Sequence, residues 1–487
     1  MTDFHFFNKK IQVPADHPAI ISRDETITYS ELIKRVDAYR AFLLSSGIKK
    51  GMHAAILSGN NAEFILLTMA LWNLGAVPVP LNVRLLDEDL EKLIQHSASE
   101  FVFIHEELKD RLPEVALESR RIIFPALFEE SLKEDIENES EKRDFNDCAL
   151  ILYTSGTTGT PKGVMHTFNT LSASAAASDT LLRQSLSDRW LASLPFYHIG
   201  GFSIPIRALL YGASIVIPQS LKAEDIAVSI ESFRPALVSL VTTTLRRLME
   251  MGIKPNKELR FMLLGGGPVD NDLAEKSIAE NWRAVKVYGS TETATLVSAV
   301  EIEKYQEKVS SAGRALPGNT IMIMDEEGRE AETGKSGEII IIGPSVMKGY
   351  WNNPEETSKK LVKGFYHTGD IGHMDIDGYL YVEARRTDLI ISGGENINPL
   401  EVEDAVLKHP SVKEACVFAL EDTEWGQTVA AVLVKKGDLQ AEELAGFLRN
   451  YLASYKIPRR IFFIDELPRT SLGKLRRDYI REMFQNS

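Results

Sequence analysis

The sequence predicts an α/β fold: a large N-terminal domain of stacked α/β subdomains with a distorted β-barrel, then a small α+β C-terminal domain. Three observations support it. Strand patterns alternate with helical patterns up to residue 287, β-rich hairpins fill residues 310–383, and a self-contained set of elements follows residue 386. Such alternation is typical of a parallel sheet covered by helices on both faces. The 487 residues suffice for about three structural units.

Helical and strand patterns alternate through the first part of the chain. A helix is expected from Thr28 to Val36 with Ser30 as its N-cap, because a serine hydroxyl accepts a hydrogen bond from unpaired amides. A second helix is expected at residues 63–74. The expected strands are short apolar runs, at residues 54–57, 77–81, 101–104, 150–153, 214–217, 236–241, 261–264 and 284–287. Residues 129–147 are acidic without apolar periodicity, which predicts an exposed excursion.

The last third of the chain changes character twice. Strand patterns with Gly and Asp-Gly turns predict a barrel or a set of hairpins, at residues 321–324, 338–342 and 379–382. The charged segment 385–388 reads as a linker, which places one domain at residues 1–386 and a second at 387–487. The second domain is expected to contain helices at 399–409 and 441–455 and strands at 412–419 and 429–434.

Composition argues against several classes of protein. The 55 basic and 69 acidic residues give a net charge of −14, and an acidic chain repels a phosphate backbone, so nucleic acid is not expected as a partner. Cys148 and Cys416 are far apart, which argues against a disulfide framework or a zinc site. Residues 64–83 are uncharged but contain Asn, Gly and Pro, which favours buried elements over a membrane span. Without a signal-peptide pattern at the start, the protein is expected in the cytoplasm.

A loop rich in small and hydroxyl residues follows the strand expected at 150–153. Its amides and hydroxyls, with the charge of Lys162, can surround one anion, so it predicts a phosphate site. It is not a Walker A loop, because Pro161 precedes the lysine and Gly163 follows it. The alternative is a flexible surface loop. The candidate ligands are Thr154, Ser155, Gly156, Thr157, Thr158, Gly159 and Lys162.

Two further segments carry small residues and a carboxylate where strands end. A glycine run ends the strand at 261–264 and leaves backbone open to a flat ring such as a purine, although a tight turn uses the same residues. That run consists of Gly265, Gly266 and Gly267, followed by Pro268. Asp370, after the glycine turn in Tyr-His-Thr-Gly-Asp, suits two ribose hydroxyls, and its alternative role is to cap that turn.

The segment Val-Tyr-Gly-Ser-Thr-Glu-Thr at residues 287–293 concentrates chemistry after a strand. Tyr288 supplies an aromatic ring, Thr291 a hydroxyl and Glu292 a carboxylate, and Gly289 is a further candidate ATP-binding residue. A single carboxylate beside a bound triphosphate is a suitable Mg²⁺ ligand, because Mg²⁺ prefers one or two carboxylates plus phosphate oxygens. The alternative is a solvated glutamate at a helix start beside a packing tyrosine.

Taken in order, these segments resemble the ANL superfamily of adenylate-forming enzymes, which includes acyl-CoA synthetases and peptide-synthetase adenylation domains. The resemblance covers essentially the whole chain: the loop at 154–163, the segment at 288–293, Thr-Gly-Asp at 368–370, the hinge region at 385–396 and the lysine at 474. It implies that a carboxylic acid reacts with ATP to give an acyl-adenylate and pyrophosphate. The thiol of coenzyme A then displaces AMP. The resemblance also implies Mg²⁺, which neutralises phosphate oxygens in the first step.

The resemblance also implies roles for individual residues. Lys474, otherwise an exposed charge in a basic stretch, is the expected catalytic lysine that bridges the substrate carboxylate and the α-phosphate. Thr291 is expected to bind the α-phosphate and Glu292 the metal. The loop at 154–162 is expected to hold pyrophosphate, with adenine between the glycine run and Tyr288. The remaining expected roles are ribose binding by Asp370 and Arg385, a hinge at Thr387 about which a mobile C-terminal domain rotates, and coenzyme A binding by Gly393 and Gly394.

The acyl pocket is expected along the apolar segment that begins near residue 194. His198 matches the superfamily position where the acyl and thiol channels meet. Arg207 is a single fixed charge in this segment, which either reaches solvent or meets an anion, since an unpaired buried charge is costly. A buried cation favours an acid with a second carboxylate, and the segment resembles the o-succinylbenzoate–CoA ligases of menaquinone synthesis.

Other acids and another reaction class stay open at this stage. A fatty-acid or aryl-acid CoA ligase is the main alternative, with Arg207 in a structural role. An adenylation domain that loads a carrier protein is a second alternative, less favoured because the one Gly-Gly-x-Ser run, at residues 200–203, lies inside the apolar acyl segment and not in a fused carrier segment. A homodimer is one option, and the sequence does not fix the oligomeric state.

Overall fold

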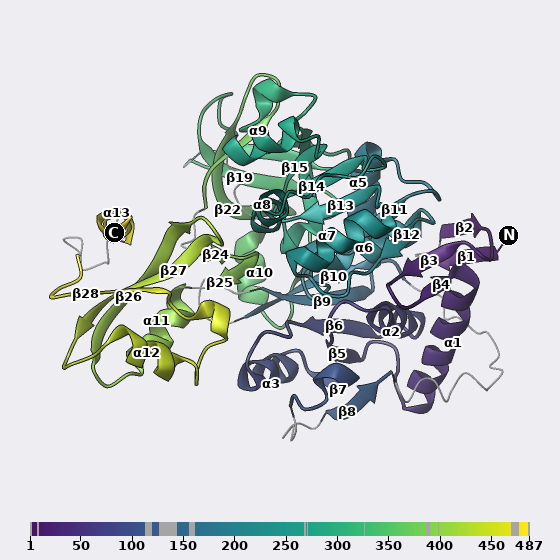
Figure 1. Ribbon diagram of the computed structural model, residues 1–487, viewed down its shortest axis with the longest axis horizontal. Helices are drawn as coiled ribbons and strands as arrows, with labels where there is room; N and C mark the ends of the chain where they lie inside the picture. Colours follow the sequence, from purple (N-terminus) through teal and green to yellow (C-terminus); the bar gives the residue numbers. More distant parts are fainter. Residues whose placement is uncertain are drawn as a thin grey trace. The chain divides into compact units, whose positions relative to one another are not determined.

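The computed structural model describes residues 2–6, 9–112, 119–125, 144–154, 161–266, 269, 271–325, 327–385, 390–397, 399–468 and 477–485 (Figure 1). It confirms the predicted α/β class. The chain forms two compact units: the first contains residues 1–83, 90–153 and 163–383, and the second contains residues 84–89, 154–162 and 384–487. The boundary predicted after residue 386 lies in residues 386–389, outside the described residues.

A four-stranded parallel sheet and its helices form the first part of the larger unit. The strand order is β6-β5-β7-β8, and Ala55 of β5 pairs with Val79 on one side and Val102 on the other. The elements are β1 (Thr2–Phe6), β2 (Lys9–Val13), α1 (Tyr29–Ser45), β5 (His53–Leu57), α2 (Ala62–Asn73), β6 (Val77–Leu81), α3 (Asp87–His96), β7 (Ser99–His105) and β8 (Arg120–Phe124). Both faces of β5 and β6 are buried, which explains why these strands read as continuous apolar runs.

A nine-stranded sheet forms the centre of the larger unit, in the order β17-β16-β15-β14-β13-β11-β12-β3-β4. Its strands are β3 (Pro18–Ile21), β4 (Thr26–Thr28), β11 (Arg189–Leu191), β12 (Ser214–Val216), β13 (Leu237–Leu240), β14 (Phe261–Leu264), β15 (Ala284–Ser290), β16 (Thr295–Glu301) and β17 (Arg314–Ala315). Its helices are α5 (Phe168–Leu182), α6 (Ile199–Leu210), α7 (Ala223–Phe233), α8 (Thr242–Glu250) and α9 (Asn271–Ala279). Trp190 and Trp282 are completely buried in this region.

Two further sheets complete the larger unit, and the antiparallel pairs between residues 320 and 374 confirm the hairpins predicted for this part of the chain. One sheet has the order β20-β10-β9, and the other has the order β18-β19-β22-β21 with β23 on β22. The elements are β9 (Cys148–Thr154), β10 (Lys162–Thr167), β18 (Thr320–Met324), β19 (Gly337–Ile342), β20 (Gly349–Tyr350), α10 (Pro354–Lys360), β21 (Leu361–Val362), β22 (Phe365–Met374) and β23 (Leu380–Arg385).

The second unit has its own sheet and core. Its strands follow the order β25-β24-β27-β26 with β28 on β27, and α11 packs on β26. The elements are β24 (Ile390–Ser392), β25 (Glu395–Ile397), α11 (Pro399–Leu407), β26 (Val412–Asp422), β27 (Gly426–Lys435), α12 (Ala441–Leu448), β28 (Arg460–Ile464) and α13 (Arg477–Phe484). A mixed sheet with helices confirms the α+β character predicted for this part of the chain.

Two expected element boundaries are wrong. The N-cap of α1 is Thr28 rather than Ser30: the Thr28 hydroxyl accepts from the Glu31 amide (3.2 Å) and the Glu31 carboxylate accepts from the Thr28 amide (2.8 Å). This reciprocal pair is a capping box, which the glutamate three residues after Thr28 makes possible. The helix expected to reach residue 455 ends at Leu448, and tight turns then bury Leu452 and Tyr455 in the core of the second unit.

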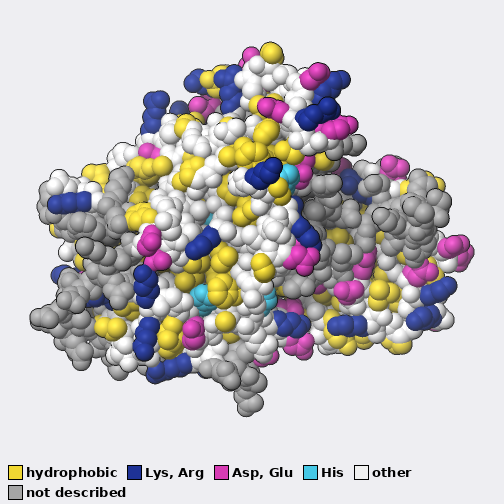
Figure 2. Space-filling model, turned by 180° about the vertical axis from the view of Figure 1, so that it is seen from behind, with side chains coloured by type: hydrophobic (Ala, Val, Ile, Leu, Met, Phe, Trp, Pro, Cys, Tyr) yellow, Lys and Arg dark blue, Asp and Glu magenta, His cyan; other side chains and the backbone are white. Residues whose placement is uncertain are grey.

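The acidic excursion predicted at 129–147 falls mostly on residues 126–143, outside the described residues. Within the described part of the chain, no helix has the length and apolar character needed to cross a bilayer. On the face shown in Figure 2, the coloured basic and acidic side chains are interspersed.

Candidate active site

The carboxyl ends of three neighbouring parallel strands meet at one edge of the central sheet. Leu240 of β13 pairs with Leu264 of β14, and Leu264 pairs with Lys286 of β15. The segments that continue from these ends are therefore brought together, including the predicted glycine run and the segment at 288–293. Ligands of open α/β sheets bind at this edge, beyond the carboxyl ends of the strands.

Two glycines of the predicted adenine site have a packing reason for their identity. A Cβ on Gly265 would lie 2.6 Å from Cγ2 of Val287, so only glycine lets β14 and β15 approach this closely. Gly266 has φ +82°, a backbone conformation that a side chain disfavours. Gly267 and Pro268 lie outside the described residues.

The turn after β15 has a fixed shape. A Cβ on Gly289 would lie 1.6 Å from the Thr295 carbonyl oxygen, and the pairing of β15 with β16 is irregular between Tyr288 and Gly289. The Thr293 hydroxyl accepts from the Ser290 amide (2.9 Å) and bonds the Thr295 carbonyl (2.8 Å). These bonds lock residues 290–293 into one short 3₁₀ turn.

Glu292 is held through both its backbone and its side chain. The Met347 amide donates to the Glu292 carbonyl (2.7 Å), and the Tyr350 hydroxyl donates to Oε1 of the Glu292 carboxylate (2.9 Å). Burial raises the pKa of Tyr350, and the nearby carboxylate raises it further, so the phenol stays a donor. Among the described residues no group of three or more His, Cys, Asp or Glu side chains could hold a metal ion. A lone carboxylate fits Mg²⁺ that arrives with phosphate oxygens.

The residues predicted for adenine and ribose contact each other. The Tyr288 hydroxyl donates to Oδ2 of Asp370 (2.7 Å). Asp370 lies in β22, where its amide donates to the Thr368 hydroxyl (2.9 Å) and the preceding Gly369 amide donates to Oε1 of Glu338 (3.0 Å). The Thr-Gly-Asp turn is thus fixed from β19, and Gly369 has φ +81°.

His166 contacts the turn formed by residues 290–293. Its ring is completely buried in β10; Nε2 lies 2.7 Å from the Thr291 carbonyl oxygen and Nδ1 lies 3.0 Å from the Thr170 hydroxyl. Burial lowers the pKa of His166 to about 4. His166, Tyr350 and Glu338 are not among the residues predicted from the sequence. For His166 the one available signal was a lone histidine in an apolar strand pattern.

The two ends of the predicted phosphate loop lie on paired strands. Thr154 ends β9 and Lys162 begins β10, its neighbour in the sheet, and both side chains are half-buried. The loop residues Ser155, Gly156, Thr157, Thr158 and Gly159 lie outside the described residues.

The acyl segment forms α6, which begins directly after His198 as its N-cap. Gly201 admits no side chain, because a Cβ there would lie 2.0 Å from the Pro195 carbonyl oxygen. The His198 ring packs edge-on against Tyr197, with centroids 4.8 Å apart.

Arg207 lies in the same helix and does not reach solvent; only 2% of the residue is exposed. Its guanidinium donates to the Thr295 hydroxyl and lies 5.7 Å from the Trp190 ring, while Nε has no hydrogen-bond partner. Among the described residues no carboxylate forms an ion pair with it. Burial lowers its pKa to about 9, as expected for a cation without a countercharge.

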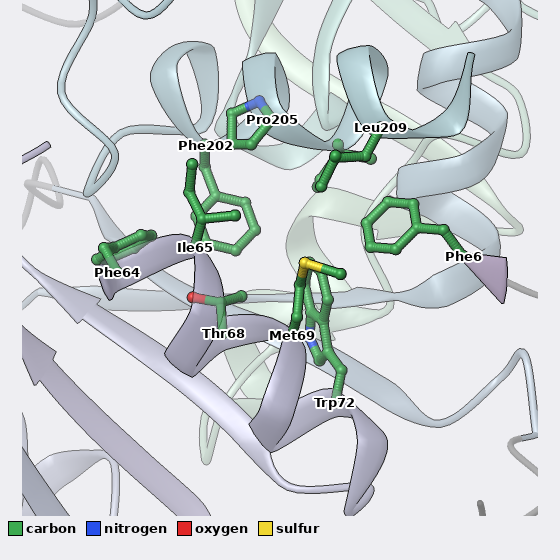
Figure 3. A pocket seen from close by; sticks show the side chains of 10 residues that line it. Phe6, Phe64, Ile65, Thr68, Met69, Trp72, Phe202, Pro205 and Leu209 are labelled. Carbon is green, nitrogen blue, oxygen red and sulfur yellow. The ribbon is translucent and has the colours of Figure 1, made fainter. Parts of the chain in front are cut away.

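A separate narrow cavity lies between α2, α6 and β1 (Figure 3). Phe6 comes from β1, Thr68 and Trp72 from α2, and Phe202 and Pro205 from α6. No charged side chain lines it, so it suits neither a triphosphate nor a carboxylate.

Several predicted residues fall outside this geometry. Lys474 and Thr387 lie outside the described residues, and of Arg385 only the backbone, at the end of β23, is described. Gly393 and Gly394 form the turn between β24 and β25, with φ +56° and +83°. A Cβ on Gly393 would lie 2.7 Å from the Trp425 ring, so this turn packs directly on an aromatic face.

Known proteins match this chain along nearly its whole length. Residues 7–351 match the AMP-binding enzyme family, and residues 401–474 match the AMP-binding enzyme C-terminal domain. The chain is 37% identical over 480 residues to the 2-succinylbenzoate–CoA ligase of Bacillus licheniformis, covering 97% of this chain and 98% of the relative.

Solved structures agree with these matches. A double mutant of the Bacillus subtilis o-succinylbenzoate CoA synthetase, bound with its product analogue OSB-NCoA, has a TM-score of 0.89 at 35% identity and 96% coverage of both chains. The same enzyme in complex with ATP and magnesium ion has a TM-score of 0.73 at 35% identity, covering 96% of this chain and 97% of the other.

Proposed function

This chain belongs to the AMP-binding enzyme family, and we propose that it is an AMP-forming ligase that converts 2-succinylbenzoate to 2-succinylbenzoyl-CoA in menaquinone synthesis. The superfamily resemblance predicted from the motifs is confirmed by that membership. The relatives named for this acid support the choice of substrate, as does the buried charge of Arg207, which forms no ion pair with a carboxylate of the described residues.

The proposed reaction has two displacements. In the first, a carboxylate oxygen of the acid attacks the α-phosphorus of ATP, a new P–O bond forms, and the bond to the bridging oxygen breaks to release pyrophosphate. In the second, the thiol of coenzyme A loses its proton and attacks the acyl carbonyl carbon, and the C–O bond to AMP breaks. Both reactants of the first step are anions, so positioning and cationic charge supply most of the catalysis.

The described residues can hold the nucleotide. Asp370 accepts hydrogen bonds from ribose, Tyr288 packs on adenine beside the glycine run, and the Thr291 hydroxyl binds the α-phosphate. Glu292, oriented by Tyr350, supplies one ligand to Mg²⁺. When bound with ATP, Mg²⁺ neutralises charge on the phosphate oxygens.

Residues of the second unit complete the proposal. We assign Lys474 to the gap between carboxylate and α-phosphate, Thr387 and its neighbours to the hinge, and Gly393 and Gly394 to the pantetheine arm. Glycine at both positions presents no side chain in the path that this proposal gives to the pantetheine arm. Arg385 is assigned to ribose.

The observation that carries the acid's identity is the environment of Arg207. Its guanidinium is buried among Thr295, Trp190 and the interior of α6, and burying a cation without an anion is unfavourable by several kcal/mol. 2-Succinylbenzoate has two carboxylates: one reacts with ATP, and the other can pair with Arg207. A monocarboxylic acid would leave this charge uncompensated.

Pyrophosphate exchange into ATP tests this assignment over a panel of acids. We expect exchange with 2-succinylbenzoate at a specificity constant about 100-fold or more above that for benzoate and octanoate, the gain typical of a desolvated charge pair. Faster exchange with octanoate or benzoate would reject the assigned acid in favour of another ligase specificity. We place the reaction in the cytoplasm, where ATP and coenzyme A are supplied.

A further inference from the structure

His166 occupies a position that the proposed reaction does not yet use. It is the penultimate residue of β10, it is completely buried, and both ring nitrogens have partners. One partner belongs to the turn that carries Thr291 and Glu292, and the other belongs to the first turn of α5. The ring therefore connects a helix start to the candidate active site.

The partners determine which nitrogen carries the proton. The Thr291 carbonyl oxygen can only accept, so Nε2 must be protonated and donate across 2.7 Å. Nδ1 then presents a lone pair 3.0 Å from the Thr170 hydroxyl, whose single proton can go to Nδ1 or to the Thr167 carbonyl oxygen at 2.9 Å. Thr170 is fixed in turn, because its hydroxyl oxygen accepts from the Thr167 amide (3.0 Å) in the capping box of α5. The low pKa of the buried ring agrees with this single-proton form.

The Thr291 carbonyl is satisfied on both lone pairs. It accepts from His166 Nε2 and from the Ala294 amide at 3.2 Å. Glu292 is held from the other side by the Met347 amide and the Tyr350 hydroxyl. Strands β10 and β20 pair through Val164 and Tyr350, so His166 and Tyr350, which hold Thr291 and Glu292, belong to one sheet.

We propose that His166 is a positioning residue for ATP activation: by donating from Nε2 to the Thr291 carbonyl, it holds the Thr291 hydroxyl and the Glu292 carboxylate at the phosphates. This inference rests on the proposed function of the turn. Groups that orient the ligands of a metal or phosphate commonly change affinity or rate by about 10–100-fold. His166 does not itself contact substrate.

Two substitutions separate positioning from packing. His166→Phe keeps the ring's shape but removes both hydrogen bonds, and His166→Gln retains an N–H that can reach the Thr291 carbonyl. The matched control is His53→Phe. His53 is also a buried strand histidine, 7% exposed, whose Nδ1 lies 2.5 Å from the Ser97 carbonyl oxygen, in the four-stranded sheet.

We expect His166→Phe to lower kcat for pyrophosphate exchange by about tenfold or more, and to weaken MgATP binding by calorimetry, with KM for the acid within about twofold of wild type. His166→Gln should recover most of both losses. His53→Phe should lower Tm without changing kcat. Wild-type kcat and MgATP affinity in a folded His166→Phe variant would overturn the proposal, as would equal losses in the Gln and Phe variants.

Failure of the proposed function is distinguishable from failure of this inference. If the wild-type protein catalyses pyrophosphate exchange with none of the acids in the panel, the ligase assignment fails. MgATP affinity still reports on the role of His166 in that case. Nitrogen-15 spectra of the histidine rings add a readout independent of catalysis: we expect His166 to be protonated on Nε2 alone at pH 7. Protonation on Nδ1 would overturn the geometry from which the inference starts.

Discussion

The Tyr288 hydroxyl donates a 2.7 Å hydrogen bond to the Asp370 carboxylate across 82 residues of sequence. Tyr288 lies near the carboxyl end of β15 in the mixed central sheet, whereas Asp370 lies in β22 of an antiparallel sheet. The contact joins the residue that we propose packs on the base to the residue that we propose accepts from ribose hydroxyls. It is the structural reason for treating these two segments as one nucleoside site.

Asp370→Asn should weaken ATP binding, because an amide replaces one carboxylate acceptor with a donor. We expect Kd for ATP to rise by about tenfold, the value of one hydrogen bond to a charged group. Tyr288→Phe should have a smaller effect, since the ring remains. Calorimetry measures both, with Tyr451→Phe as a control on the second unit. Unchanged affinity in Asp370→Asn would remove this residue from the site.

Arg207→Met tests the distal-carboxylate assignment. Methionine approximates the volume without the charge, so KM for 2-succinylbenzoate should rise by about 100-fold while KM for benzoate changes by about twofold or less. Steady-state kinetics with both acids gives the comparison.

Arg260→Met is the matched control for Arg207→Met. Arg260 is 37% exposed and pairs with Asp188 at 2.7 Å, and its loss should lower stability without discriminating between the acids. If Arg207→Met impaired both acids equally, the arginine would be structural.

Lys474→Ala separates the two half-reactions. Adenylate formation should fall by about 1,000-fold or more, because two anions then approach without the bridging cation. Thioester formation from chemically prepared acyl-adenylate should stay within about threefold of wild type. Stopped-flow measurement of each step tests this, with Lys413→Ala, an exposed position on β26, as the control. Equal loss in both steps would contradict the assigned role.

The burial of His166 predicts a specific pH dependence of stability. Its pKa is about 4 in the folded protein and near 6.5 when unfolded, so the unfolded chain binds more protons between these values. Stability from this residue is complete above pH 6.5 and is lost as the pH falls toward 4, by about 3 kcal/mol at most. Urea unfolding at a series of pH values from 7 to 4.5 gives the free energy of unfolding, which should fall less steeply with decreasing pH in His166→Gln than in the wild type. An identical pH dependence of the free energy of unfolding in both proteins would show that His166 does not cause the loss of stability.

Local patterns predicted the elements because each strand and helix carries its own apolar signature. The strands expected between residues 54 and 287 are present, and the parallel order brings the predicted glycine run and the 288–293 turn to one edge. The N-cap of α1 was wrong because Thr28 and Ser30 are both plausible caps, and the reciprocal bond from Glu31 decides between them.

The supporting residues could not be predicted because their roles depend on strand pairing. His166 is 125 residues from Thr291, and Tyr350 is 58 residues from Glu292, so neither contact leaves a local pattern. The sequence also left two positions open for Arg207. The structure shows that Arg207 lies in the protein interior, because every residue of α6 from Gly201 to Leu210 is buried.

The central claim is that this chain forms an acyl-CoA and AMP from 2-succinylbenzoate, ATP and coenzyme A. The most direct measurement is mass spectrometry of the products after incubation of the wild-type protein with these three substrates and Mg²⁺. The account predicts succinylbenzoyl-CoA, AMP and pyrophosphate in equal amounts. Formation of ADP and phosphate, or AMP without the thioester, would contradict it.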